Sequence, residues 1–145
     1  MVSCPFFYYF IVQVQNVSSP LHNLICGLVH ISELQKAIIE QFAPRFAPGA
    51  ECLYVGDTIE KDLVKNTEKL AELGFEITLH DKMPDVVLYR KDVNWIYFIE
   101  SVTSVGPMNP KRLIEIQDMT KKVNAGKIFV TAFLDFKTYK KFSED

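Results

Sequence analysis

The sequence predicts an α/β domain with a mixed β-sheet flanked by helices, whose core elements follow the order αβββαβ. Apolar runs of strand length, rich in β-branched and aromatic residues, occur at 51–56, 75–79, 85–89, 95–100 and 127–134. A helical stripe lies between the last two of these, at Leu113, Ile116, Met119 and Val123. Because most of the strands are continuous apolar runs, helices should cover both faces of the sheet.

Composition sets broad limits on function. The 145 residues suffice for a single domain with a real core, and the net charge of −2 argues against a uniformly basic nucleic-acid coat. It still permits a local basic stripe, because lysines and one arginine gather between 111 and 141. The three cysteines contain no CxxC pair, so neither a disulfide framework nor a zinc site is indicated, and a reducing, cytoplasmic setting is expected.

The first 32 residues differ from the rest, and we treat residues 1–32 as an apolar segment of unknown role beside a domain at 33–145. The segment contains no Lys, Arg, Asp or Glu. Its apolar run at 5–12 is far shorter than the roughly 20 residues that span a bilayer, and no basic start marks a secretory signal. We therefore expect no membrane contact, and β-prone segments that either join the sheet or mediate self-association.

The domain itself should begin with a helix capped by Ser32, which ends before Pro44. After the strand at 51–56, a second helix is expected from Asp57 to its end at Gly74. The strand at 75–79 then leads into the two strands of a hairpin.

The later elements follow from caps and apolar spacing. Asn109 and Pro110 suit the N-cap and first position of a helix that Ala125 and Gly126 would end. The strand at 127–134 comes next, and a polar tail from Phe136 onward could hold a short helix.

The hairpin carries one carboxylate on each strand. Asp85 opens the first strand and Glu100 closes the second, so antiparallel pairing brings both to one end. Two neighbouring acids at a half-buried strand end are costly, and a divalent cation offsets that cost. Mg²⁺ takes one or two protein carboxylates together with phosphate and water. In the alternative interpretation, Asp85 ends a turn and Glu100 pairs with an arginine.

The wider strings around these acids are more specific. KMPDVVLY, NWIYFIESVTSVGPMNPKR and KIFVTAF, with PRFAPGAECLYVGDT before them, resemble the C-terminal domain of BsuBI/PstI type II restriction endonucleases, from about residue 34 to about residue 142. That family is part of the PD-(D/E)XK nuclease superfamily. The resemblance implies a restriction-endonuclease-like core and Mg²⁺-dependent hydrolysis of duplex DNA at a CTGCAG-type palindrome. It also implies a homodimer whose twofold axis matches that of the DNA.

The resemblance also implies roles for individual residues. Asp85 and Glu100 would bind the metal, with Glu60 as a further ligand unless Asp57 and Glu60 merely cap a helix. The superfamily lysine, expected two residues after the glutamate, is Val102 here. Lys82, Lys61 and Lys111 compete for its role, and Lys111 is favoured because superfamily lysines can move to the neighbouring helix. Contacts to phosphate or water are expected from Arg112, Lys82, Ser101, Thr103 and Ser104.

Two other functions stay open. A non-catalytic DNA-binding or remnant module would explain Val102 and an N-terminal segment unlike the helical region that the family carries there. A small-molecule binding domain is also conceivable, but the chain has no Gly-rich phosphate loop such as GxGxxG.

Overall fold

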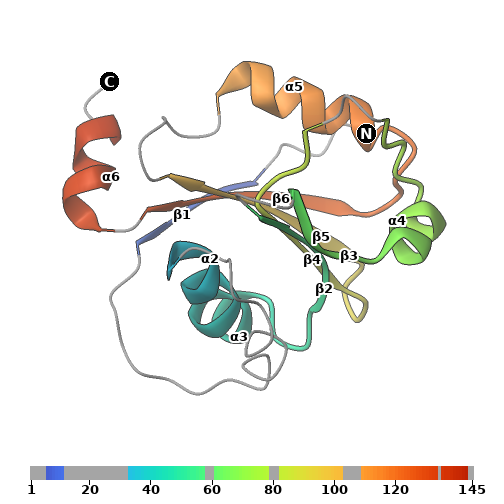
Figure 1. Ribbon diagram of the computed structural model, residues 1–145, viewed down its shortest axis with the longest axis horizontal. Coiled ribbons are helices and arrows are strands. Elements are labelled where there is room, and N and C mark those ends of the chain that lie inside the picture. Colours follow the sequence, from blue (N-terminus) through green and yellow to red (C-terminus); the bar gives the residue numbers. More distant parts are fainter. Residues whose placement is uncertain are drawn as a thin grey trace.

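The sheet is mixed and its strand order is β1-β6-β5-β4-β2-β3 in the computed structural model, which describes residues 6–11, 33–57, 61–78, 82–102, 109–133 and 135–143 (Figure 1). The strands are β1 (Phe6–Ile11), β2 (Glu51–Asp57), β3 (Lys61–Lys65), β4 (Val86–Arg90), β5 (Trp95–Val102) and β6 (Gly126–Phe133). The helices are α2 (Glu33–Ala37), the π-helix η1 (Ile38–Phe42), α3 (Ala43–Phe46), α4 (Thr67–Leu73), α5 (Pro110–Met119) and α6 (Phe136–Ser143).

Pairing divides the sheet into two halves. The β3–β2–β4–β5 half is antiparallel, whereas β5, β6 and β1 run parallel to one another. The predicted class, a mixed sheet flanked by helices, is confirmed. The αβββαβ core consists of the helical segment 33–46, β2, β4, β5, α5 and β6, with β3 and α4 inserted. The first of the three strands was predicted at 75–79, which was wrong.

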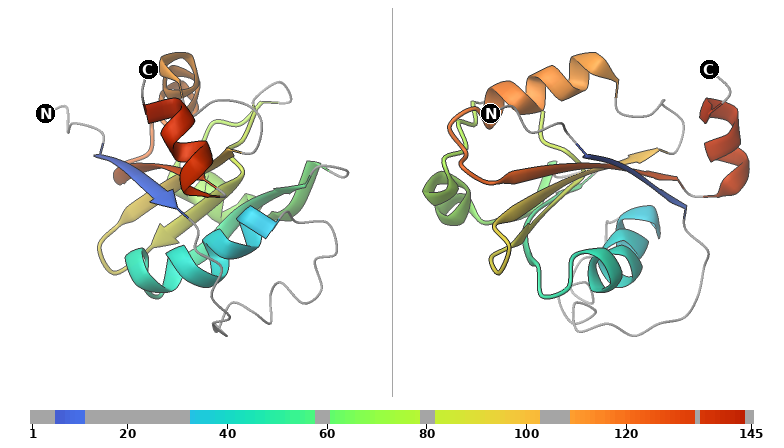
Figure 2. Two further views of the ribbon diagram at one scale, coloured as in Figure 1. Left: turned by 90° about the vertical axis from the view of Figure 1, so that its left-hand side faces the viewer. Right: turned by 180° about the vertical axis from the view of Figure 1, so that it is seen from behind.

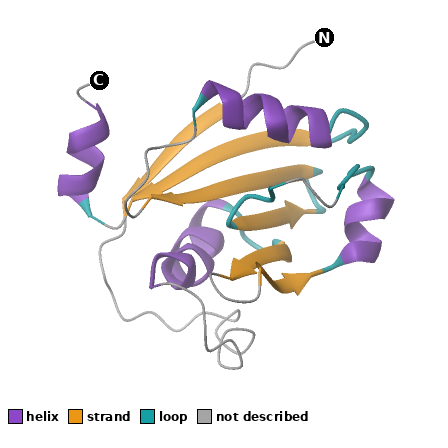
Figure 3. Cartoon of the chain, turned by 45° about the horizontal axis from the view of Figure 1, so that its top comes forward, coloured by secondary structure: helices purple, strands orange, loops and turns teal. Residues whose placement is uncertain are grey.

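Helices cover both faces of the sheet, as the views from the side and from above show (Figures 2 and 3). The segment 33–46 packs on one face, where it meets Tyr97 and Ile99 of β5. Helices α4 and α5 pack on the other face, against Ile96 and Phe98. Successive side chains of β5 therefore point alternately into two separate cores. Both sets are apolar, so the strand is a continuous apolar run. None of the helices that are described is long and apolar enough to cross a membrane.

The first helical segment continues past Pro44, where the sequence predicted an end. Within η1 the hydrogen-bond register widens, and the Ala43 N–H donates to the carbonyl of Ile38. Pro44 then lies in the first turn of α3, where its missing N–H breaks no helical bond. The predicted stop was wrong because the wider turn gives the proline a tolerated position.

The helix predicted from Asp57 to Gly74 is a strand followed by a shorter helix. Asp57 ends β2, and β3 pairs antiparallel with β2. Helix α4 begins only after Asn66, whose side chain accepts the Lys69 N–H at 3.1 Å. The C-terminal signal was right, since Gly74 closes α4 with φ of 101°. Pairing along the free edge of β2 outweighs the weak local preference for helix.

Two further predictions fail at the far end of α5. Residues 75–78 form no ladder, although Phe75 is buried and the Glu76 N–H donates to the carbonyl of Met119. Helix α5 ends at Met119, and the Thr120 hydroxyl donates to the Ile116 carbonyl where the chain turns. Val123 is nevertheless buried, so the apolar stripe was right and the helix end was wrong.

The N-terminal segment contributes β1, which pairs in parallel with β6 from Phe6 to Ile11. Of the two interpretations of this segment, pairing with the sheet is therefore the one that the structure shows. The division of the chain at residue 32 stays a prediction. The predicted cap at Ser32 lies outside the described residues.

Candidate active site

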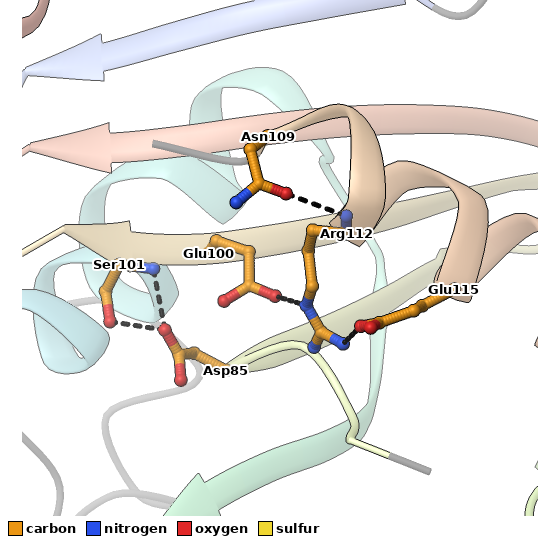
Figure 4. Close-up of polar contacts among 6 residues, drawn as sticks. All are labelled: Asp85, Glu100, Ser101, Asn109, Arg112 and Glu115. Atoms are coloured by element: carbon orange, nitrogen blue, oxygen red, sulfur yellow. Dashed lines mark hydrogen bonds and ion pairs between the residues drawn. The ribbon is translucent and has the colours of Figure 1, made fainter. Parts of the chain in front are cut away.

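Asp85 and Glu100 lie next to each other at one end of the β4–β5 ribbon. Val86 pairs with Ile99, so the residue before β4 and the residue after Ile99 face each other across the ladder. The turn at 91–94 sets this register, with Asn94 in the left-handed region at φ of 54°. The position that the sequence predicted for the two acids is thus the position that the structure shows (Figure 4).

One oxygen of Asp85 is held by Ser101. Oδ2 accepts the Ser101 backbone N–H at 2.7 Å and its hydroxyl at 2.6 Å. The Asp85 carbonyl accepts the Gly56 N–H at 2.9 Å, which ties the residue to β2 as well. Two donors on one carboxylate oxygen, with the backbone fixed on the neighbouring strand, give Asp85 a defined orientation.

One oxygen of Glu100 is held by an arginine from the following helix. Arg112 Nε donates to Oε1 at 2.6 Å, and Arg112 Nη1 donates to Glu115 at 3.2 Å. Arg112 reaches this place because Asn109 caps α5, accepting the Arg112 backbone N–H at 2.9 Å. Glu100 therefore pairs with an arginine, as the alternative interpretation of the sequence predicted.

The charge on Glu100 is incompletely compensated. Burial raises the pKa of its carboxyl above the ordinary value, Asp85 adds to that rise, and Arg112 and Lys82 act in the opposite direction. The side chain of Glu100 is 19% exposed and that of Arg112 is 12% exposed. The carboxylate pair is thus a partly desolvated site that favours additional positive charge.

Each carboxylate keeps a second oxygen available. Toward the described residues, Asp85 Oδ1 and Glu100 Oε2 make no hydrogen bond, and Figure 4 shows Oε2 on the side of Asp85. Two neighbouring carboxylates are what Mg²⁺ takes when phosphate and water complete its shell. The residues present therefore fit a magnesium ion, although no group of three ligand side chains occurs in the described part of the chain.

The lysine candidates differ in their relation to the pair. Val102, where the superfamily lysine would stand, is buried at 1% exposure. Lys82 is exposed, and its charge acts on Glu100. Lys111 is exposed in the first turn of α5. Lys61 lies on β3 rather than on the expected helix.

Some predicted residues cannot be placed, and one contributor was missed. Glu60, Thr103 and Ser104 lie outside the described residues. Glu115 was missed, although its spacing of three residues from Arg112 on a predicted helix is the usual signal of an ion pair. The roles predicted for the site residues, including phosphate contacts by Arg112 and Lys82, stay predictions.

Comparison with known proteins gives a consistent result. Residues 21–145 match the family described as BsuBI/PstI restriction endonuclease domain. The chain is 50% identical over 102 residues to the type II restriction enzyme BsuBI of Bacillus subtilis, across 70% of this chain and 32% of that enzyme. It is 27% identical over 122 residues to the type II restriction enzyme AplI of Arthrospira platensis, across 77% of this chain and 36% of that enzyme.

A solved structure shares the fold. The SdaI restriction endonuclease superposes with a TM-score of 0.68 at 34% identity, over 77% of this chain and 35% of that one. The chain thus spans about a third of the length of the proteins it matches.

Proposed function

The chain belongs to the BsuBI/PstI restriction endonuclease family, and on that premise we propose that it is a Mg²⁺-dependent type II endonuclease that hydrolyses phosphodiester bonds of duplex DNA. The observation that carries this proposal is the pairing of Asp85 with Glu100. Each carboxylate is fixed through one oxygen, and its other oxygen makes no hydrogen bond to the described residues. PD-(D/E)XK restriction endonucleases generally use a divalent metal, and these two oxygens are suited to hold it.

The contacts support a division of roles among the site residues. Asp85 and Glu100 would hold Mg²⁺, which when bound polarises the scissile phosphate and lowers the pKa of a coordinated water. Ser101 keeps Asp85 in place through its N–H and hydroxyl. A lysine then steers the water and meets the charge that develops on the phosphate, a role for which Lys111 was favoured from the sequence.

Family membership supports a proposal about the substrate and the assembly. We propose a palindromic duplex site of the CTGCAG type, cut by a homodimer whose symmetry matches that of the site. The proposed setting is the cytoplasm, where a host would meet invading DNA. Sedimentation with and without a duplex carrying the site tests the dimer, since a single subunit on each palindrome would contradict it.

Plasmid cleavage tests the central proposal. Supercoiled DNA carrying CTGCAG sites should be cut with Mg²⁺ and left intact in EDTA.

A second candidate is a DNA-binding module without catalysis. The buried Val102 in place of the superfamily lysine favours it. A folded chain that binds the duplex but never nicks it, with Mg²⁺ or with Mn²⁺, would support this candidate and exclude the nuclease.

A further inference from the structure

Arg112 is shared between two carboxylates and fully satisfied by neither. Its Nε contacts Glu100 at 2.6 Å and its Nη1 contacts Glu115 at 3.2 Å. Its Nη2 is buried and has no hydrogen-bond partner among the residues described. A permanent buried ion pair is stabilising only when its remaining donors are satisfied. The hydrogen-bonding capacity of Arg112 is therefore only partly met by the residues described.

The arginine acts on the oxygen pair that would receive the metal. A cation held by Glu100 Oε2 lies on the same carboxylate that Arg112 binds through Oε1. Two positive charges bound to the two oxygens of one carboxylate repel each other strongly, because the site is partly desolvated and poorly screened. Lys82 adds a weaker positive influence from its exposed position.

We propose that Arg112 is the counter-ion of Glu100 in the free chain and competes with the divalent cation for that carboxylate. This inference rests on the proposed function, because it assigns Asp85 and Glu100 to the metal. It gives Arg112 a role through Glu100 rather than a direct contact with a DNA phosphate. Arg112 is thus a positioning residue that sets how tightly the metal binds before DNA arrives.

Glu115 sets the strength of this competition. It is the more exposed partner, at 45%, and it draws part of the guanidinium away from Glu100. Without its charge, Arg112 would be left to Glu100 alone. Substitutions at the two positions should therefore change metal affinity in opposite directions, which a merely structural role would not produce.

The experiment measures Mn²⁺ binding without DNA at pH 8, in the chain and its variants. Arg112→Gln should bind Mn²⁺ at least about tenfold more tightly, because a competing charge is gone. Arg112→Lys should stay close to the parent because it keeps the charge. Glu115→Gln should bind a few-fold more weakly, by roughly the strength of a helix ion pair.

Two control variants distinguish a general effect of removing a charge from the specific effect of the arginine charge that contacts Glu100. Arg90→Gln removes an arginine from the other end of the ribbon, where it pairs with Asp92 at 2.6 Å. Asp118→Asn removes an acid from the same helix that does not contact Arg112. Neither should change Mn²⁺ affinity more than about twofold, because charges distant from the site are screened.

The outcomes distinguish this inference from the function on which it rests. If Asp85→Asn and Glu100→Gln abolish Mn²⁺ binding but Arg112→Gln binds as the parent does, only the competition is overturned. If those two variants bind normally, the metal site and the competition both fail. If Arg112→Gln weakens DNA binding in EDTA and reduces its salt dependence by about one ion, the arginine contacts phosphate and the inference is wrong. If Arg112→Gln does not fold, the weaker Mn²⁺ binding expected in Glu115→Gln still tests the competition.

Discussion

Ser101 holds Asp85 with two hydrogen bonds on a single oxygen, Oδ2, from its N–H at 2.7 Å and its hydroxyl at 2.6 Å. Ser101 directly follows Glu100 on β5, so one strand supplies both a carboxylate of the pair and the group that fixes the other carboxylate. Any disturbance at the end of β5 should therefore reach both acids together.

Ser101→Ala should slow cleavage about tenfold, because a hydroxyl bond to a charged group is worth roughly 1.5–3 kcal/mol and the backbone N–H remains. The measurement is single-turnover cleavage of a duplex at saturating Mg²⁺. Ser101→Thr is the matched control, since it keeps the hydroxyl. An unchanged rate in Ser101→Ala would show that the N–H alone positions Asp85.

Asp85→Asn and Glu100→Gln should each abolish cleavage while the fold survives, because each removes a carboxylate oxygen with little change in volume. Thermal unfolding checks the fold, and plasmid cleavage checks the activity. DNA binding in EDTA should be retained by both variants. Retained cutting by either would remove that residue from the proposed metal site.

Lys111→Ala should lower the cleavage rate by orders of magnitude if Lys111 replaces the lysine missing at Val102. The structure offers Lys82 as the matched comparison, since its charge acts on Glu100. Single-turnover rates of Lys111→Ala and Lys82→Ala, measured side by side, assign the role. A normal rate in the first and a large loss in the second would transfer it to Lys82, and normal rates in both would leave Lys61.

Stability should depend on pH through Glu100. Burial raises the pKa of its carboxyl above 4.5 in the folded state, so the folded chain holds more protons than the unfolded chain between the two values. The contribution of Glu100 to stability is therefore present at low pH and is lost as pH rises through the raised value. Urea unfolding in EDTA, from about pH 4 to about pH 8, should show the parent losing stability relative to Glu100→Gln. A constant difference between the two would contradict the raised pKa.

Gly74→Ala should destabilise the chain by about 1–3 kcal/mol, because φ there is left-handed and an added Cβ would lie 2.8 Å from the Lys122 carbonyl oxygen. Gly49→Ala is the matched control. Gly49 has φ of 72° but open space around it, so only the backbone cost of about 1 kcal/mol applies. Equal losses of unfolding free energy in the two variants would show that the close approach to Lys122 has no cost.

Local chemistry was enough to predict several elements from the order of the residues. The β4–β5 hairpin follows from two apolar runs around a polar turn, and it alone brings Asp85 opposite Glu100. Asn109 and Pro110 marked the start of α5, and Gly74 marked the end of α4. These signals act within a few residues, so no distant contact was needed to interpret them.

The tertiary structure alone decided what depends on distant neighbours. The free edge of β2 made a strand of 61–65, the π-turn carried the helix past Pro44, and the segment 75–78 packs at the end of α5, where the Glu76 N–H donates to the Met119 carbonyl. At the site, the contacts of Ser101 to Asp85 and of Arg112 to Glu100 join residues 16 and 12 positions apart. Such contacts arise only when strand and helix ends meet in space, because the sequence gives residue types but not the faces that packing brings together.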